Sequence, residues 1–470
     1  MDLSDLSMTI AGAAVPGAET FGVINPATGS VFAEAPDCSR EQLDAAFDSA
    51  AKAYRDWRGD LGARREALGR AAEVVMAAAE ELAPILTSEQ GKPLKDSLME
   101  LYGTAMWFQY FAALELPREI IQDDENMRAE VLRRPLGVVA AITPWNFPVM
   151  LGAWKIAPAL LAGNTVVLKP SPYTPLTTLK FGQLLRGVLP DGVLNVVTGR
   201  DPLGALMTAH PVPRKISFTG SIETGKKVAT AAGPDLKRVT LELGGNDPAI
   251  LLDDIDPAAI ADTIFASSFA NNGQVCSAIK RVYVHESHHD ELVDALSARA
   301  RAATVGDGLG EGVDFGPINN RPQYDRVSEL VADAIAGGAT AAAGGKPIDG
   351  DGYFFEPTII AGASDGTRLV DEEQFGPALP VISYRDIDDV IERANATNYG
   401  LGASIWGTDT ERATHHATQL ESGTVWVNTH MAVAPNLPFG GAKWSGIGVE
   451  NGPWGYYGFT ELQLIQHNKT

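Results

Sequence analysis

The sequence contains little cysteine and no excess of basic charge. Only two cysteines occur in 470 residues, Cys38 and Cys276, which is too few for a disulfide framework and is typical of a reducing compartment such as the cytoplasm. Lysine and arginine total 37 against 59 aspartates and glutamates, giving a net charge of −22. Phosphate backbones and acidic membranes attract basic surfaces, so we expect neither nucleic acid nor a membrane as a partner.

Long hydrophobic runs are also missing. No stretch of about 18 apolar residues occurs, and the first 20 residues lack the basic and apolar segments of a secretory signal. We therefore expect a cytoplasmic protein. Its 45% hydrophobic and 20% charged residues are ordinary for a globular chain of this length, which is enough for two or three domains.

Apolar spacing changes along the chain. Residues 40–115 have the period of helices, whereas strands and helices alternate from about residue 135. Such alternation indicates a doubly wound parallel sheet with helices on both faces. The predicted strands are 138–143, 165–169, 194–197, 215–219 and 239–243, and the helices are 148–161, 174–188, 203–208 and 223–232.

A second α/β region follows Gly244-Gly245. Its predicted strands are 281–284, 381–384, 403–406 and 424–428, with a helix at 291–303. Residues 460–466 also have strand character. This tail either pairs with another subunit's sheet or forms an ordinary edge strand.

Polar residues and glycines follow the predicted strands of the first sheet. Ligands of open parallel sheets bind at the carboxyl ends of strands, so these segments predict a binding crevice. The dinucleotide fingerprint GxGxxG is absent. The five segments are Thr143-Pro144-Trp145-Asn146, Lys169-Pro170-Ser171, Thr198-Gly199, Thr219-Gly220-Ser221 and Glu242-Leu243-Gly244-Gly245.

One of these turns resembles a P-loop. Residues 220–227 fit GxxxxGK, but Lys227 stands where the magnesium-binding Ser or Thr is required. A glycine turn that opens a helix still favours phosphate through free N–H groups and the helix dipole. The alternative is a plain strand-to-helix turn.

Three residues together are candidates for catalysis, although a lone cysteine is more often a buried small hydrophobe and a strand-end glutamate is more often a cap or an ion-pair partner. Cys276 lies in Asn271-Asn272-Gly273-Gln274-Val275-Cys276-Ser277, a composition that indicates a loop or a helix start. There a lowered thiol pKa would make Cys276 a nucleophile. Glu242 ends an apolar strand, so we expect a raised pKa, suited to a general base. The Asn146 amide is a candidate donor to an oxyanion.

Together these segments resemble the aldehyde dehydrogenase superfamily. The resemblance runs from Phe21 to Phe459, with consistent order and spacing. Its most specific pieces are Ile142-Thr143-Pro144-Trp145-Asn146-Phe147-Pro148, Phe218-Thr219-Gly220-Ser221, Leu241-Glu242-Leu243-Gly244-Gly245, Gly273-Gln274-Val275-Cys276, Glu373-Gln374-Phe375-Gly376-Pro377 and Pro438-Phe439-Gly440-Gly441-Ala442-Lys443.

The resemblance implies an α/β architecture in three parts. A doubly wound parallel-sheet cofactor domain is expected over 1–117 and 134–244, and a second α/β catalytic domain over 245–445. A small β oligomerisation flap is expected over 118–133 and 446–470, within a homodimer or homotetramer.

The resemblance also implies catalytic roles. Cys276 is similar to the family's nucleophile, and Asn146, with the Cys276 backbone N–H, to its oxyanion hole. Glu242 is similar to the general base for deacylation. Glu450 resembles a second glutamate that some members use in proton relay, and its alternative is a surface residue.

Further resemblances concern the cofactor and the aldehyde. Lys169 and Glu373 are similar to residues that hold the two riboses, and Ser221 lies where the family binds pyrophosphate. The residues expected to line a substrate tunnel could equally be ordinary residues of the hydrophobic core. The expected cofactor set is Thr143, Trp145, Lys169, Ser171, Gly199, Gly204, Phe218, Gly220, Ser221, Leu243, Gly244, Glu373 and Phe375, and the expected tunnel set is Met150, Trp154, Val275, Ser277 and Phe439.

One position departs from the family pattern. NAD-preferring members often carry glutamate three residues after the lysine that corresponds to Lys169, where it repels a 2′-phosphate. Here Pro172 stands at that position. NAD is the expected cofactor because no new arginine stands beside Ser171, and NADP use stays open.

Other interpretations of the protein's function remain open. A CoA-acylating relative usually lacks the glutamate that corresponds to Glu242, and a P-loop nucleotidase is disfavoured by Lys227. A non-enzymatic relative is disfavoured by the intact Cys276 and Asn146. His285, His288 and His289 lack the spacing of zinc ligands, so no metal is expected. Arg281 is either a cation for a carboxylated aldehyde or a strand residue on the domain surface, and the identity of the aldehyde stays open.

Overall fold

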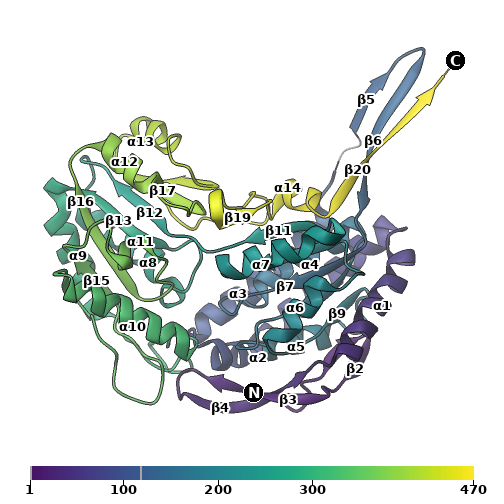
Figure 1. Cartoon of the computed structure of the whole chain (residues 1–470), viewed down its shortest axis with the longest axis horizontal. Coiled ribbons are helices and arrows are strands. Elements are labelled where there is room, and N and C mark those ends of the chain that lie inside the picture. The colour runs from purple at the N-terminus through teal and green to yellow at the C-terminus, as the bar shows by residue number, and fades with distance from the viewer. Residues whose placement is uncertain (1–2, 117–118, 470) are drawn as a thin grey trace.

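The computed structural model describes residues 3–116 and 119–469, which form four sheets (Figure 1). The strands of the first sheet are β1 (Met8–Ile10), β2 (Ala13–Val15), β7 (Val138–Ile142), β8 (Thr165–Lys169), β9 (Leu194–Val196), β10 (Lys215–Thr219), β11 (Arg238–Glu242) and β19 (Gly446–Ile447). The accompanying helices are α1 (Arg40–Trp57), α2 (Leu61–Gln90), α3 (Leu94–Ala113), α4 (Met150–Ala162), α5 (Leu176–Leu184), α6 (Asp201–Ala209) and α7 (Ile222–Ala232).

The first sheet is doubly wound, as predicted. Its order is β19-β11-β10-β7-β8-β9-β1-β2, and the five strands from β11 to β9 are parallel. The chain moves from β7 outward to β9, then returns to place β10 on the other side of β7. The strand order thus reverses between β7 and β10, which is where open α/β sheets bind ligands.

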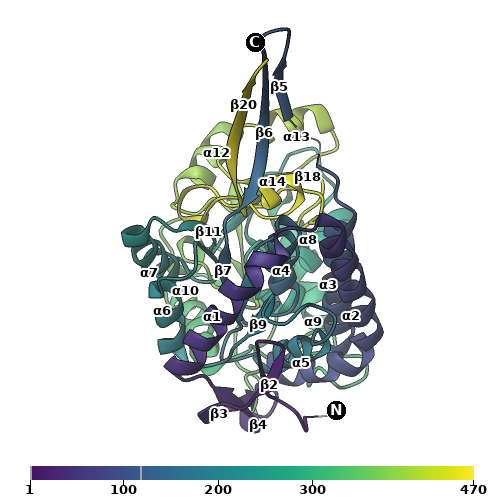
Figure 2. The ribbon, with the colours of Figure 1, turned by 90° about the vertical axis from the view of Figure 1, so that its right-hand side faces the viewer.

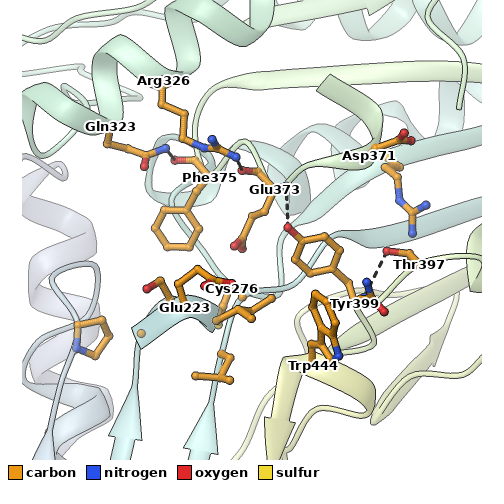
Figure 3. Close-up of a pocket in the computed structure, with 18 of the residues that line it drawn as sticks. Glu223, Cys276, Gln323, Arg326, Asp371, Glu373, Phe375, Thr397, Tyr399 and Trp444 are labelled. Atoms are coloured by element: carbon orange, nitrogen blue, oxygen red, sulfur yellow. Dashed lines mark hydrogen bonds between the residues drawn. The ribbon is translucent and has the colours of Figure 1, made fainter. Parts of the chain in front are cut away.

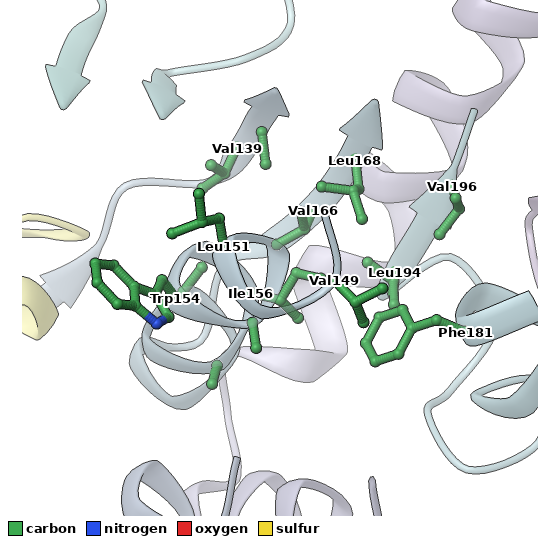
Figure 4. Close-up of a cluster of buried hydrophobic side chains, with 14 of the residues drawn as sticks. Val139, Val149, Leu151, Trp154, Ile156, Val166, Leu168, Phe181, Leu194 and Val196 are labelled. Atoms are coloured by element: carbon green, nitrogen blue, oxygen red, sulfur yellow. The ribbon is translucent and has the colours of Figure 1, made fainter. Parts of the chain in front are cut away.

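Burial on both faces explains the apolar runs of these strands. Strands β7, β8 and β10 are buried at every residue, as expected for a parallel sheet covered by helices. Helices α4 and α5 pack with α2 and α3, while α6 and α7 pack with each other and α6 with α1. Figure 4 shows Leu151 and Ile156 of α4 gathered against Val139 and Val166 of the strands.

The second sheet is also largely parallel. Its strands are β12 (Asp247–Leu251), β13 (Ile279–His285), β14 (Thr340–Ala343), β15 (Thr358–Ala361), β16 (Ala378–Tyr384), β17 (Gly402–Trp406) and β18 (Thr424–Val427). Their order is β14-β15-β16-β13-β12-β17-β18, and only β14 is antiparallel to its neighbour. The helices of this half are α8 (Pro257–Phe269), α9 (His289–Ala302), α10 (Arg321–Ala336), α11 (Arg368–Asp371), α12 (Ile387–Asn395) and α13 (Thr410–Ala417). Helix α14 (Gly452–Tyr457) packs instead on α4 of the first half.

A three-stranded arm projects from the body (Figures 1 and 2). It consists of β5 (Glu119–Asp123), β6 (Met127–Pro135) and β20 (Thr460–Asn468), in the order β20-β6-β5. The predicted tail strand therefore exists and pairs antiparallel with β6 of its own chain. A separate hairpin joins β3 (Glu19–Asn25) to β4 (Ser30–Asp37).

The predicted elements agree with the structure to within a few residues at each end, and the mixed α/β class is confirmed. Strand β12 escaped prediction because it begins with Asp247-Pro248, and proline is normally excluded from central strands. A register shift between these two residues accommodates it. The predicted domain boundaries stay a prediction, and the one between 117 and 118 falls outside the described residues.

No helix within the described parts of the chain is long and apolar enough to cross a membrane.

Asn164 ties three segments together in the core. Its Nδ2 donates to the carbonyls of Ala159 and Phe459, and its Oδ1 accepts from the Gly137 N–H. In Asn164→Ala the Ala159 carbonyl keeps the backbone N–H of residue 164 as a donor, whereas the Gly137 N–H and the Phe459 carbonyl lose their side-chain partner. We therefore expect a loss of about 1–3 kcal/mol in unfolding free energy for each of these two groups. Chemical denaturation measures this loss. The exposed Lys52→Ala should stay within about 0.5 kcal/mol of the parent, and equal stability of both variants would contradict the assignment.

Candidate active site

A cavity of about 950 Å³ lies at the carboxyl ends of the first sheet, facing the second sheet. It opens beside the reversal point between β7 and β10. Figure 3 shows the Glu373 side chain directed into this cavity on the side of Cys276. Nine predicted site residues line it: Trp145, Asn146, Gly220, Ser221, Leu243, Gly244, Cys276, Glu373 and Phe375.

The remaining predicted cofactor residues do not line this cavity. Phe218 packs beneath the β10 turn, since a Cβ on Gly220 would lie 2.5 Å from its ring. Thr143 is buried, and its hydroxyl has no hydrogen-bond partner among the residues that the structure describes. A Cβ on Gly199 would meet Leu203, whereas a Cβ on Gly204 would meet open space.

Lys169 and Ser171 are buried near a second cavity. Burial lowers the pKa of Lys169 to about 8, opposed by Asp201 and Asp37. The second cavity, of about 490 Å³, is lined by Pro172 and Arg200 among others, but neither Lys169 nor Ser171 lines it.

Cys276 lies in a turn that leads into β13 rather than at a helix start. Asn271, Asn272 and Gly273 precede it with φ of 46°, 58° and 74°, three consecutive left-handed residues. A Cβ on Gly273 would lie 2.2 Å from the Gly376 carbonyl oxygen, so only glycine permits this close approach. The turn thus packs the Cys276 loop against the segment that carries Glu373 and Phe375.

The expectation of a lowered thiol pKa is wrong for this structure. Burial raises the pKa of Cys276 to about 12, opposed by the Lys280 ammonium and reinforced by Glu373 and Glu242. Lys280 Nζ donates to the carbonyls of Val275 and Cys276 rather than to the sulfur. Cys276 is therefore a protonated thiol at neutral pH.

Asn146 is held on three sides. Its Nδ2 donates to the Gln274 carbonyl at 2.9 Å, two residues before Cys276. Its own carbonyl accepts from Lys92 Nζ at 2.7 Å and from Asn271 Nδ2 at 3.2 Å. Asn146 and Cys276 thus share both the cavity and one hydrogen-bonded unit.

Glu242 is buried behind this lining, and neither carboxylate oxygen has a hydrogen-bond partner in the structure. Burial, and then the charge of Glu450, raise its pKa well above the ordinary value, while Lys155 opposes the rise. The raised pKa expected from the sequence is therefore confirmed.

The surface interpretation of Glu450 is wrong. Its carboxylate is buried and pairs with Lys155 Nζ at 2.6 Å, and Lys155 also donates to Thr219 Oγ1. Sequence reasoning missed Lys155, although a lone lysine in the apolar helix α4 was a signal that a buried partner exists. Arg281 is also buried rather than on the surface, and it donates to the Asn246 and Ala394 carbonyls.

Two further residues missed in the sequence brace the Glu373 segment. Gln323 Nε2 donates to the Phe375 carbonyl at 3.1 Å, and Arg326 Nη2 to the Glu373 carbonyl at 3.1 Å. Both start from α10, whose helical pattern was not recognised in the sequence. They line the cavity together with Tyr399, whose hydroxyl accepts from the Glu373 N–H (Figure 3).

The predicted tunnel residues lie outside the cavity lining. Trp154 stacks on Trp107 at 5.3 Å and meets Phe439 edge-on at 5.5 Å, while Met150 is half-buried. Val275 and Ser277 are buried beside Cys276. A tunnel through these residues stays a prediction.

The three histidines have separate partners. His285 contacts Ser287, His288 the Asp253 carbonyl and His289 Asp290. Across residues 3–116 and 119–469, no three His, Cys, Asp or Glu side chains are grouped to hold a metal ion.

The buried thiol predicts how alkylation depends on pH. With the pKa of Cys276 at about 12, the reactive thiolate fraction should rise about tenfold per pH unit from pH 7 to 10. Iodoacetamide labelling of Cys276, followed by peptide mass analysis, measures this slope. A plateau below pH 9 would contradict the assignment.

Comparisons with known proteins agree on one family. The model of the "Aldehyde dehydrogenase family" matches residues 14–465. A phenylacetaldehyde dehydrogenase from Pseudomonas fluorescens is 43% identical over 92% of this chain and 90% of its own. A chloroplastic betaine aldehyde dehydrogenase from Beta vulgaris is 38% identical over 94% of this chain and 92% of its own.

A solved structure has the same fold. The NAD⁺ complex of an aldehyde dehydrogenase from Bacillus cereus superimposes with a TM-score of 0.97 at 34% identity, over 99% of this chain and 97% of that one. The chain therefore belongs to the aldehyde dehydrogenase family, the oxidoreductases that oxidise aldehydes with a nicotinamide dinucleotide.

Proposed function

We propose that this protein oxidises an aldehyde to its carboxylic acid with NAD, through a covalent intermediate on Cys276. One observation carries the proposal. Cys276 and Asn146 line one cavity, and the Asn146 amide is anchored to the Cys276 loop at Gln274. A nucleophile and an oxyanion donor are thus held in one unit, with Glu242 buried behind them.

The cavity fits a nicotinamide dinucleotide. Helix α7, eleven residues long, begins at the cavity, where its first N–H groups and the Ser221 cap can receive pyrophosphate. A Cβ on Gly244 would lie 2.3 Å from Glu373 Oε2, so glycine leaves room for a carboxylate that can accept ribose hydroxyls. Trp145 and Phe375 meet edge-on at 5.2 Å and offer apolar surface to the nicotinamide end.

The first chemical step forms a bond to sulfur. The Cys276 thiol gives its proton to solvent in the cavity that it lines, and the thiolate attacks the aldehyde carbon to give a thiohemiacetal oxyanion. Asn146 Nδ2–H and the Cys276 backbone N–H stabilise this oxygen, and one such donor contributes about 10²–10³ in rate. When bound, the nicotinamide would supply the hydride acceptor, and loss of hydride from the thiohemiacetal carbon would leave a thioester on Cys276.

The second step hydrolyses the thioester. Glu242 takes a proton from water, which attacks the acyl carbon and releases the acid and the Cys276 thiolate. The proton on Glu242 then passes toward the Glu450–Lys155 pair. The charge interaction between Glu242 and Glu450, together with the 2.6 Å Lys155 contact, supports this role.

An apolar aldehyde is the first substrate class to test. Trp154, Phe439 and Met150 are apolar, and the 43% identical relative is a phenylacetaldehyde dehydrogenase. Arg281, which lines the cavity, is already bonded to protein carbonyls and gives no free cation for a carboxylated aldehyde. Pro172 carries no charge to repel a 2′-phosphate, so NADP is the second cofactor to test.

We also propose a homodimer or homotetramer joined through the β5-β6-β20 arm, at its edge strands. The predicted cofactor domain (1–117 and 134–244), catalytic domain (245–445) and cytoplasmic location stay proposals. The arm exposes apolar side chains to water, and a partner subunit would cover them. These residues are Ile120, Ile121, Leu462, Leu464 and Ile465.

Glu242→Gln tests the proposed function. The variant should form the thioester but hydrolyse it about 10²–10⁴-fold more slowly, because the amide cannot activate water. Stopped-flow absorbance should show a burst of reduced nicotinamide followed by near-arrest. Full steady-state turnover would contradict the role of Glu242 as the general base. Turnover that requires coenzyme A would favour the CoA-acylating alternative.

Glu450→Gln tests the charge interaction. The carboxylate of Glu450 raises the pKa of Glu242, so its removal lowers that pKa. Glu242 acts only when ionised, and activity is present above its pKa and lost as pH falls through it. The acidic limb of the kcat profile should therefore move to lower pH in this variant. An unmoved or higher limb would rule out the coupling.

A further inference from the structure

A fully buried lysine adjoins the active site without a part in the chemistry above. Lys92 lies between α2 and α3, and its side chain and that of its partner Glu100 are wholly inaccessible to solvent. Removing an ammonium from water costs several kcal/mol, and a buried ion pair adds little net stability. The hydrogen bonds of the ammonium and of its partner show which segments this charge pair holds in place.

Each partner of this ion pair reaches the segment that follows β7. Lys92 Nζ donates to Glu100 Oε2 at 2.7 Å and to the Asn146 carbonyl at 2.7 Å. Glu100 Oε1 accepts the N–H groups of Val149 and Met150, at the start of α4. The pair therefore clamps residues 146–150 at both ends.

The clamp determines where the Asn146 amide lies. Asn271 Nδ2 donates to the same Asn146 carbonyl at 3.2 Å, so two donors fix this peptide group. Of the two amide hydrogens on Nδ2, one is directed to the Gln274 carbonyl, which leaves the other for a substrate oxygen. Because the peptide group carries the side chain, a shift of the carbonyl moves the amide donor.

On the basis of the proposed function, we propose that Lys92 is a positioning residue that holds the Asn146 amide where the oxyanion forms. Lys92 touches neither aldehyde nor cofactor in this account. It acts through the Asn146 carbonyl, and its loss should impair only reactions in which a carbonyl oxygen gains charge.

Two reactions of Cys276 distinguish a loss of Asn146 positioning from general damage to the Cys276 loop. Neither reaction uses the cofactor. With p-nitrophenyl acetate, the thiolate attacks the ester carbonyl, an oxyanion forms and p-nitrophenolate leaves. With iodoacetamide, the thiolate displaces iodide from a methylene carbon and no oxyanion forms. A disordered nucleophile loop would slow both reactions, whereas a misplaced Asn146 amide would slow only the first.

Lys237 provides the matched control. It is also a buried lysine, and its Nζ donates to the Thr208 and His210 carbonyls and pairs with Asp235. It precedes β11, at the end of the strand opposite Glu242. Lys237→Met should therefore cost stability without changing either reaction of Cys276.

We expect Lys92→Met to slow acylation by p-nitrophenyl acetate about tenfold or more, since a displacement of about 1 Å can cost about 10² in rate. Alkylation by iodoacetamide should stay within about twofold of the parent. Asn146→Ala alone should lose about 10²–10³ in acylation, and adding Lys92→Met should cause no further loss. If Lys92→Met fails to fold, Asn271→Gly removes the second donor while tolerating the left-handed φ, and it should show the same selective loss.

Three results would overturn the inference: unchanged acylation in folded Lys92→Met, an equal fall in both reactions, or an undiminished effect of Lys92→Met in the Asn146→Ala background. The proposed function fails in a different way. If Asn146→Ala itself acylates normally, the oxyanion assignment falls, and the positioning role falls with it.

Discussion

The parallel arrangement of the central strands is the constraint on which the rest of this protein depends. Parallel strands all end at one edge, and the reversal of order between β7 and β10 opens a space there that no crossover helix covers. Asn146 follows β7, Ser221 follows β10 and Glu242 ends β11. The second sheet supplies Cys276 and Glu373 from the opposite side. Residues distant in sequence are therefore brought together by topology rather than by local motif.

Buried charge is the second theme of the site. The Lys92–Glu100 pair adjoins Asn146 and the Lys155–Glu450 pair adjoins Glu242, and all four side chains are withdrawn from solvent. Such pairs are poor sources of stability, but removal of one partner is costly, so each fixes the segments it contacts. One pair holds the backbone of Asn146, and the other sets the charge felt by Glu242. Both are consistent with a site that controls protons and oxyanions away from bulk water.

The sequence predicted much of this arrangement, for identifiable physical reasons. Strands covered on both faces become short apolar runs, which made β7 to β11 recognisable. Glu242 stood out as a carboxylate at the end of such a run, and its raised pKa followed. Strand β12 was hidden by Pro248, and the thiol pKa of Cys276 was misjudged because burial outweighs the nearby Lys280.

The supporting residues were harder to predict because their partners are remote. Lys92 lies 54 positions from Asn146, and Lys155 lies 295 positions from Glu450. No periodicity or motif links such pairs. A lysine within an apolar helix shows only that some partner exists, and the fold determines which one.

The most direct test of the central claim is an aldehyde panel, beginning with phenylacetaldehyde, assayed with NAD and NADP separately, with Cys276→Ala as the control. Formation of reduced nicotinamide by the parent, with none in the control, is the result this account predicts. Silence across a broad panel, or activity that survives in Cys276→Ala, would contradict the assignment of Cys276 as the nucleophile.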